Sequence, residues 1–394
     1  MSERRATNFS QAFERSGQVG HFERKGLIFL IPSLQGGGAE KVASELLPYL
    51  SEKFRITLAL LQHKWDYKPS REIATISFSP PLSSNVAHIA RLPYHVVSLA
   101  ALIRNTRTNV VLSFMEQANL INILCSLFTS HSAVISQRIM PQLQYRRKGW
   151  LGRAMLFGSR MLYPRASHIT AVSNEIRNFL LSSYRINSEK VSFTPNPVNI
   201  KNLQEQAREP LPFPVRKPYI LHVGRFSVEH KAQDIVLEVF SRLKVRNDSL
   251  SLVFVGEGAD REKIISFTQS LNLSHAVYFA GWQENVATFM ANADLLLLPS
   301  RREGWPNVLV ESMACGCPVV SSDCQSGPRE IIGNDLYGLL TPVNDVEALC
   351  NAASRLLEDI DLAAHFREQG YRRAREFGVE RISSEYVRLI ERFA

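Results

Sequence analysis

Short apolar runs alternate with amphipathic stretches along most of the chain. The runs of the first half lie at residues 27–31, 55–61, 110–114, 133–136, 168–172 and 191–194, and those of the second half at 219–223, 252–255, 277–279, 295–298 and 319–321. Runs of this length suit buried strands, and the stretches between them suit helices, for example at residues 39–50, 96–104, 119–128 and 380–393. Strands that alternate with helices predict parallel sheets with helices on both faces.

The alternation breaks once, in a polar segment rich in proline, and then restarts. Such a segment indicates a linker between domains. The sequence therefore predicts two doubly wound, Rossmann-like α/β domains that face each other across a cleft. The predicted parts are a flexible tail at 1–25, an N-terminal domain at 26–195, a linker at 196–217, a C-terminal domain at 218–378 and a terminal helix at 379–394. Ligands of such sheets bind beyond the carboxyl ends of the strands.

Residues 300–311, with the sequence SRREGWPNVLVE, join a predicted strand to a predicted helix at such an end. Pro306 fits the first helical turn, where a missing N–H group costs no hydrogen bond. Gly304 leaves the loop backbone room to approach a ligand. The N–H groups of Asn307 and Val308 would then lie at the positive end of the helix dipole, which predicts a phosphate site.

Two carboxylates flank this predicted phosphate site. Glu303 lies in the loop, and Glu311 lies in the helix eight positions later. Carboxylates beside an anion site are consistent with a ligand that carries both phosphates and hydroxyls, as a nucleotide sugar does. The alternative for Glu311 is an exposed helix carboxylate, which its apolar neighbours disfavour.

A pair of cations marks another strand end. Gly224 and Arg225 follow a strand, and Lys231 lies six residues after Arg225. Arginine can bind a departing diphosphate bidentately and lysine can bind it as a point charge, so the pair could replace a divalent metal. No Asp-x-Asp motif lies in a loop where a metal diphosphate would need one, and we expect no metal and no other cofactor. The alternative is a solvated surface pair.

Together these motifs resemble the retaining glycosyltransferases of family 4, which have the GT-B fold. The likeness rests on the E-x7-E pattern, on the cation pair, on the glycine turn at Gly256, on the glycine loop at 36–38 and on residues 317–331, and it spans about residues 26–390. The resemblance implies that Glu311 accepts hydrogen bonds from the ribose hydroxyls and Glu303 from hydroxyls of the transferred sugar. It also implies that the terminal helix crosses back to the N-terminal domain.

The N-terminal half contributes fewer candidates. Backbone N–H groups at Gly37 and Gly38 would meet the donor diphosphate, although three consecutive glycines can also form an ordinary turn. Many family members carry a histidine in the stretch that matches residues 135–141. This chain has none there, so Arg138 is the candidate to approach the sugar or the acceptor, with a structural surface arginine as the alternative. Asn196 and Glu116 are further candidates, and His222 is expected in the core.

The formal net charge of +9 is unevenly distributed. Residues 1–200 hold 24 Lys and Arg against 11 Asp and Glu, whereas residues 201–394 hold 22 against 26. Residues 145–165 contain six cations, no acid and interleaved apolar residues such as Trp150 and Phe157. Such a stretch suits an anionic membrane interface, and the alternative is an ordinary amphipathic helix packed on the sheet.

Other sequence features bear on the compartment. We find no apolar run long enough to span a membrane and no signal peptide. Five cysteines without a regular framework indicate a reducing compartment. Cys315, Cys317 and Cys324 are close in sequence, but no fourth ligand completes a zinc site, and we expect them as small buried side chains. The predicted location is cytoplasmic, attached to the inner face of the membrane.

The prediction is thus a glycosyltransferase, retaining as the resemblance implies, that moves a hexose or N-acetylhexosamine from a UDP-linked donor to a lipid-linked saccharide during cell-surface glycan assembly. Two alternatives stay open: a sugar-nucleotide epimerase on the same fold, and a non-catalytic module that binds an anionic polymer. A phosphorylase would need a cofactor lysine motif that is absent. Nucleic acid is not an expected partner, because zinc-finger, helix-turn-helix and aromatic RNA-binding motifs are missing.

Overall fold

The computed structural model describes residues 24–79, 92–142 and 149–394. The predicted tail at 1–25 lies almost entirely outside the described residues. By its internal contacts the chain forms two compact units. The first contains the described residues up to Ser136 together with Arg165–Ile169 and Ser383–Ala394, and the second contains Gln137–Pro164 and Thr170–Ile382.

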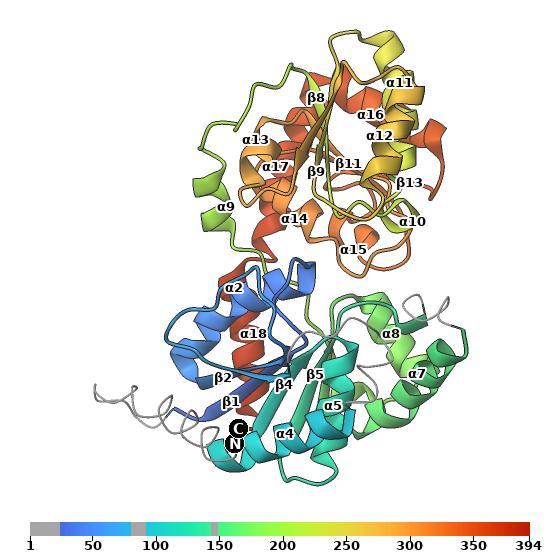
Figure 1. The fold of residues 1–394 in the computed structure, drawn as a ribbon. Helices are drawn as coiled ribbons and strands as arrows, with labels where there is room; N and C mark the ends of the chain where they lie inside the picture. Colours follow the sequence, from blue (N-terminus) through green and yellow to red (C-terminus); the bar gives the residue numbers. More distant parts are fainter. Residues whose placement is uncertain (1–23, 80–91, 143–148) are drawn as a thin grey trace. The chain divides into compact units, whose positions relative to one another are not determined.

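The first sheet has seven strands in the order β3-β2-β1-β4-β5-β6-β7 (Figure 1). Its strands are β1 (Gly26–Ile31), β2 (Arg55–Gln62), β3 (Ala74–Ser79), β4 (Val110–Phe114), β5 (Ser132–Gln137), β6 (His168–Ala171) and β7 (Val191–Phe193). The helices of this half are α2 (Gly38–Lys53), α4 (Leu92–Thr106), α5 (Glu116–Ser126), α7 (Gly149–Leu162) and α8 (Asn174–Ser183). The central strands β1 and β4 are almost wholly buried and apolar, because helices cover both faces of a parallel sheet.

The second sheet has six parallel strands in the order β10-β9-β8-β11-β12-β13. Its strands are β8 (Tyr219–Val223), β9 (Ser251–Val255), β10 (Val277–Gly281), β11 (Leu295–Leu298), β12 (Val319–Ser322) and β13 (Leu339–Thr341). The helices are α9 (Ile200–Gln206), α10 (Val228–Lys231), α11 (Gln233–Arg246), α12 (Arg261–Ser270), α13 (Ala287–Asn292), α14 (Asn307–Ala314), α15 (Pro328–Ile332), α16 (Val346–Glu358) and α17 (Ile360–Arg375). Helices α11 and α12 lie on one side of this sheet and α13 and α14 on the other (Figure 1).

Two strands, β3 and β13, were not predicted from the sequence. Both lie at the edge of their sheet, and β13 has only three residues. Edge strands are buried on fewer sides than central ones, so their sequences carry no continuous apolar run. β3, with the sequence ATISFS, alternates apolar and polar residues instead.

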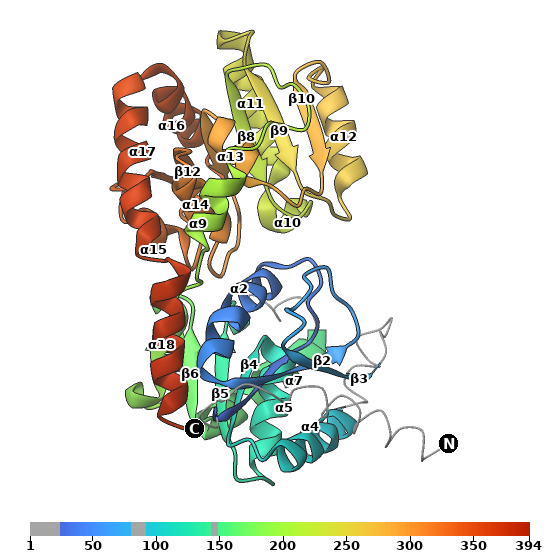
Figure 2. The same ribbon diagram turned by 90° about the vertical axis from the view of Figure 1, so that its left-hand side faces the viewer.

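The last helix, α18 (Val379–Glu391), brings the end of the chain to the first sheet (Figure 2). The ring of Tyr386 lies 6.1 Å from that of Phe114 in β4, and the ring of Phe393 lies 6.2 Å from that of His168 in β6. Lys25 also donates a hydrogen bond to the backbone oxygen of Ala394. The C-terminal segment is therefore part of the packing of the first unit.

Candidate functional site

The predicted donor motifs gather at one edge of the second sheet. Gly224 follows β8, Gly256 follows β9 and Ser300 follows β11 within two residues, and these three strands are adjacent and parallel. Parallel strands end at the same edge, so the loops that carry these residues lie side by side. This is the edge at which open α/β sheets bind ligands.

Close backbone contact requires glycine at the end of β9. A Cβ atom at Gly256 would lie 2.1 Å from the carbonyl oxygen of Gly224, and the φ of Gly256 is +135°. The N–H group of Gly224 donates to the carbonyl of Val255 at 3.0 Å. The two loops are thus held together directly, and only a residue without a side chain fits between them.

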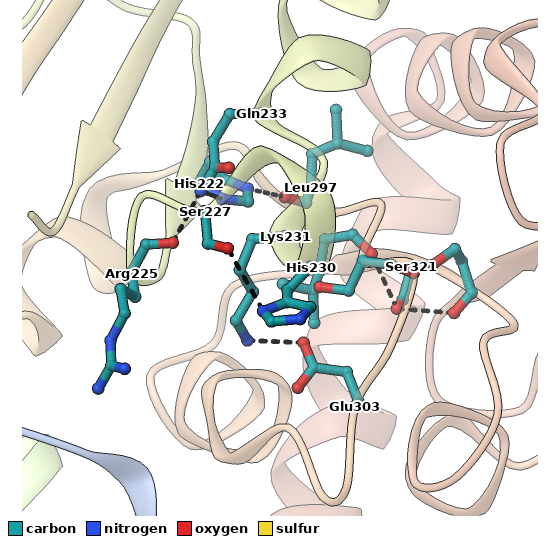
Figure 3. A network of polar contacts seen from close by, with 12 residues as sticks. His222, Arg225, Ser227, His230, Lys231, Gln233, Leu297, Glu303 and Ser321 are labelled. Carbon is teal, nitrogen blue, oxygen red and sulfur yellow. Dashed lines mark hydrogen bonds and ion pairs between the residues drawn. The ribbon is translucent and has the colours of Figure 1, made fainter. Parts of the chain in front are cut away.

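The centre of the site is an ion pair between Lys231 and Glu303 (Figure 3). The Nζ atom of Lys231, the last residue of α10, lies 2.6 Å from Oε1 of Glu303, which belongs to the loop before α14. Glu303 is buried, with 9% of its side chain exposed, and Lys231 retains 21%. An ammonium group has three donors, so Lys231 keeps hydrogen-bonding capacity for a ligand beside this carboxylate.

Arg225 is placed differently from Lys231. Its side chain is exposed and extends away from the ion pair (Figure 3), while its backbone oxygen accepts a hydrogen bond of 3.0 Å from Gln233. The predicted pair of cations therefore does not form one cluster. Lys231 is paired with a carboxylate at the sheet edge, and Arg225 projects toward solvent beside it.

The helix that carries Glu311 begins one residue later than predicted. Pro306 is the residue that caps α14 rather than a member of its first turn, and Asn307 is the first helical residue. The reason is that Pro306 has an extended ψ of 90°. Glu311 lies in the second turn of α14 and is buried. The alternative of an exposed helix carboxylate is therefore wrong.

Gly304 is needed for a reason that the sequence did not indicate. A Cβ atom there would lie 2.2 Å from the carbonyl oxygen of Arg138. We expected Gly304 to leave room for a ligand, whereas in the structure its missing side chain leaves room for the backbone of Arg138. The absence of a side chain at Gly304 thus lets two chain segments approach each other.

Arg138 joins a chain of side-chain hydrogen bonds in the second unit. Its guanidinium donates to the side-chain oxygen of Asn196, whose Nδ2 donates to Oδ1 of Asn307 at 2.6 Å. Arg138 is half-buried and Asn196 is buried, so this arginine is not a solvated surface residue. The first residue of α14 is fixed by side chains distant in sequence. No local pattern predicts such a contact.

A carboxylate from the first turn of α2 lies against the glycine loop of the first unit. Gly37 caps α2 and Gly38 is its first residue, and a Cβ atom at Gly37 would lie 2.2 Å from Oε2 of Glu40. Glu40 is buried. Glu116, the other candidate of this unit, is buried as the first residue of α5.

His222 is a core residue, as predicted. Its Nδ1 atom lies 2.9 Å from the carbonyl oxygen of Leu297, and burial, with a smaller contribution from the charge of Lys231, lowers the pKa of His222 to about 4. Cys324 lies close enough to Glu303 for that carboxylate to add to the main effect of burial, and both raise the pKa of the thiol. Cys315, Cys317 and Cys324 are all buried, as expected.

Within residues 24–79, 92–142 and 149–394, no group of three or more His, Cys, Asp or Glu side chains is arranged to hold a metal ion. No helix in these ranges is long and apolar enough to cross a membrane.

Comparisons with known proteins identify the class of enzyme. Residues 204–373 match the family model for glycosyl transferases group 1, and residues 36–202 match the model for glycosyltransferase family 4. Sucrose-phosphate synthase from Thermosynechococcus elongatus has a similar structure, with a TM-score of 0.81, 21% identity and coverage of 93% of this chain and 99% of that one. The chain belongs to the group 1 and family 4 glycosyltransferases and has the GT-B fold.

Two curated relatives show what similar chains do. One is N-acetylgalactosamine-N,N'-diacetylbacillosaminyl-diphospho-undecaprenol 4-alpha-N-acetylgalactosaminyltransferase of Campylobacter jejuni, 29% identical over 362 residues, which cover 91% of this chain and 98% of the relative. The other is lipopolysaccharide 1,6-galactosyltransferase of Salmonella typhimurium, 35% identical over 184 residues, or 45% of this chain and 49% of that protein. The first relative matches along almost its whole length.

Proposed function

We propose that this protein is a retaining glycosyltransferase that moves a hexose or N-acetylhexosamine from a UDP-linked donor to a lipid-linked saccharide. The observation that carries the proposal is the Lys231–Glu303 pair, 2.6 Å long, at the edge of the second sheet. In this proposal the ammonium group of the pair would bind the diphosphate, and its carboxylate would accept hydrogen bonds from sugar hydroxyls. The buried Glu311 provides a second carboxylate for the ribose.

The roles of these groups follow from the charge that develops during transfer. When the bond between the sugar and the diphosphate breaks, negative charge grows on the diphosphate. Lys231 and the N–H groups at the start of α14 would stabilise it, with the exposed Arg225 as a mobile third donor. Because these groups supply a positive field, we propose that no metal and no other cofactor is needed.

Retention of configuration is proposed on the family pattern and on the state of Glu303. A double displacement needs a carboxylate that is free to attack the anomeric carbon. Glu303 is held by Lys231 instead, which suits hydrogen bonding to a sugar. In the front-face route that we propose, the departing diphosphate takes the proton of the acceptor hydroxyl, and the protein positions both substrates.

A lipid-linked acceptor is supported by the Campylobacter relative, whose name describes transfer to a saccharide on diphospho-undecaprenol. Its match extends over 91% of this chain. An enzyme of this kind must work at a membrane surface, so one of its own surfaces should fit lipid headgroups. We propose that the enzyme works on the cytoplasmic face.

Helix α7 offers such a surface. Trp150, Phe157 and Met161 recur on one side of the helix and are 80%, 67% and 49% exposed. Its opposite side packs inward, since Ser159 is buried and its hydroxyl lies 2.8 Å from that of Tyr184. The helix is thus packed on one side and apolar on its exposed side.

Positive charge accompanies the exposed apolar side of α7. Arg153, Arg160 and Arg165 are exposed, and α7 has no acidic residue. The predicted cations Arg146, Arg147 and Lys148 lie outside the described residues. Apolar side chains flanked by cations suit insertion among anionic lipids.

The decisive experiment measures transfer and configuration together. The protein is incubated with UDP-, GDP- and ADP-linked hexoses and N-acetylhexosamines, with and without a polyprenyl-diphosphate saccharide, and the product linkage is determined by NMR. Acceptor-dependent transfer with an α-linked product from an α-linked donor is expected. Conversion of the donor without acceptor would indicate an epimerase, binding without turnover would indicate a binding module, and an inverted linkage would overturn retention.

A further inference from the structure

The backbone bends directly after Lys231. Ala232 ends α10 and starts α11, with φ 54° and ψ 45°, and it is buried. A residue other than glycine adopts this left-handed conformation at a cost in free energy. The direction in which Lys231 projects depends on this bend, so other contacts must maintain it.

Arg301 contacts both sides of the bend. Its Nη1 donates to the carbonyl oxygen of Val228 in α10 at 2.6 Å, and its Nη1 and Nη2 meet the two carboxylate oxygens of Asp234 in α11 at 3.0 and 2.8 Å. Its Nε donates to Oδ1 of Asn344 at 2.8 Å, and its backbone N–H donates to the carbonyl of His230 at 2.8 Å.

These contacts connect the segment that carries Lys231 with the loop that carries Glu303. Arg301 is two residues before Glu303, and it contacts residues three before and three after Lys231. One guanidinium thus holds the segment of Lys231 to the loop of Glu303. The planar fork matches the two oxygens of Asp234, which an ammonium group cannot do.

We propose that Arg301 is a positioning residue of the donor site, which acts through Lys231. It fixes the bend at Ala232 and so sets the Lys231 ammonium against Glu303. The effect on transfer rests on the function proposed above, whereas the effect on Lys231 itself does not.

Arg302 provides a matched control. It is the next residue, has the same charge and also forms an ion pair, in this case with Glu229 in α10. It contacts only one side of the bend through this pair. Replacing Arg302 therefore changes charge and packing similarly without releasing α11 from α10.

The first test does not depend on activity. Lys231 is acylated with a succinimidyl ester, and the rate is measured by peptide mass spectrometry. Arg301→Ala should raise the rate about two- to fivefold, the factor for weakening a partly exposed ion pair, and the milder Asp234→Asn should raise it less. Arg302→Ala should leave it unchanged. Equal rates in wild type, Arg301→Ala and Asp234→Asn would overturn the proposal.

The second test is a double-mutant cycle on kcat/KM for the donor. Arg301→Ala should lower kcat/KM about ten- to hundredfold in the wild type but have almost no further effect in Lys231→Ala, because coupled residues are not additive. Arg301→Lys should not restore kcat/KM to the wild-type value. Additive losses would show a merely structural role and overturn the proposal. If the wild type transfers no sugar at all, the proposed function fails, and the acylation rates still decide the role of Arg301.

Discussion

At the scale of single residues, Glu303 is a buried charge whose partner comes from another element. It is buried and faces Lys231 at 2.6 Å, in a loop whose next residue, Gly304, packs on the backbone of Arg138. A buried carboxylate without a partner would be costly. Lys231 therefore stabilises Glu303 in the free enzyme, and under the proposed function its remaining donors would bind a phosphate of the sugar donor.

Replacement of the two cations tests this arrangement. Lys231→Ala removes a preorganised donor and should cost about 2–4 kcal/mol of transition-state stabilisation, read from kcat/KM. Arg225→Ala should cost less than Lys231→Ala, because Arg225 is exposed and must first be ordered by the ligand. Lys263→Ala, an exposed lysine in α12, is the control. Wild-type turnover in Lys231→Ala would show that Lys231 does not stabilise the transition state.

The same cations bear on the metal requirement. Transfer should persist in excess EDTA, since in the proposed mechanism Lys231, Arg225 and the start of α14 supply the positive charge that stabilises the departing diphosphate. The measurement compares initial rates before and after chelation and after adding back magnesium or manganese. Loss of turnover with EDTA that either metal restores would contradict the prediction.

At the scale of elements, helix α7 has one packed side and one exposed apolar side. Its buried side packs through Ser159 onto Tyr184, and its outer side exposes Trp150 and Phe157. The sequence pattern suggested a membrane surface and internal packing as alternatives, but a helix has two sides. The sequence could not show which residues of α7 are buried. The structure does, and burial separates the residues that face the protein from those that face solvent.

Membrane attachment through α7 predicts a specific loss. Each Lys or Arg near an anionic surface contributes roughly 1 kcal/mol, so Arg153→Glu with Arg160→Glu should weaken liposome binding strongly, and Trp150→Ala with Phe157→Ala should also reduce it. Binding should require anionic lipid and weaken at high salt. Co-sedimentation provides the measurement.

The control for α7 makes the same charge change elsewhere. Arg242→Glu with Arg246→Glu alters two exposed arginines of α11 and should leave liposome binding nearly intact. If both double variants lose binding equally, net charge rather than α7 is responsible. If the wild-type protein does not bind anionic liposomes at low salt, a soluble acceptor becomes the better proposal.

At the scale of the whole molecule, the periodic features were predictable and the long-range contacts were not. Apolar runs predicted the buried central strands of both sheets, and the apolar run before Ser300 together with Gly304 and Pro306 predicted the site loop and its helix. The Lys231–Glu303 contact joins residues 72 positions apart, and the Arg138–Asn196 contact spans 58. Such contacts depend on the order in which strands pair in the sheet. The local sequence around each residue therefore does not predict them.

Buried histidines predict how stability depends on pH. Burial lowers the pKa values of His131, His168 and His222 to about 4. In the unfolded chain they titrate near their usual pKa, so between about pH 6.5 and 4 the unfolded state binds more protons than the folded state. The free energy of unfolding should therefore fall as the pH drops through this window, by up to about 1.4 kcal/mol per pH unit for each histidine.

Urea denaturation at about pH 7.5, 6 and 5 measures this slope. His222→Gln removes one titrating group and should flatten the pH dependence, even if it lowers stability at neutral pH by disturbing the contact with Leu297. His275→Gln changes an exposed histidine and should leave the slope as in the wild type. The explanation fails if the His222 variant keeps the full slope, because another group would then take up the protons on unfolding.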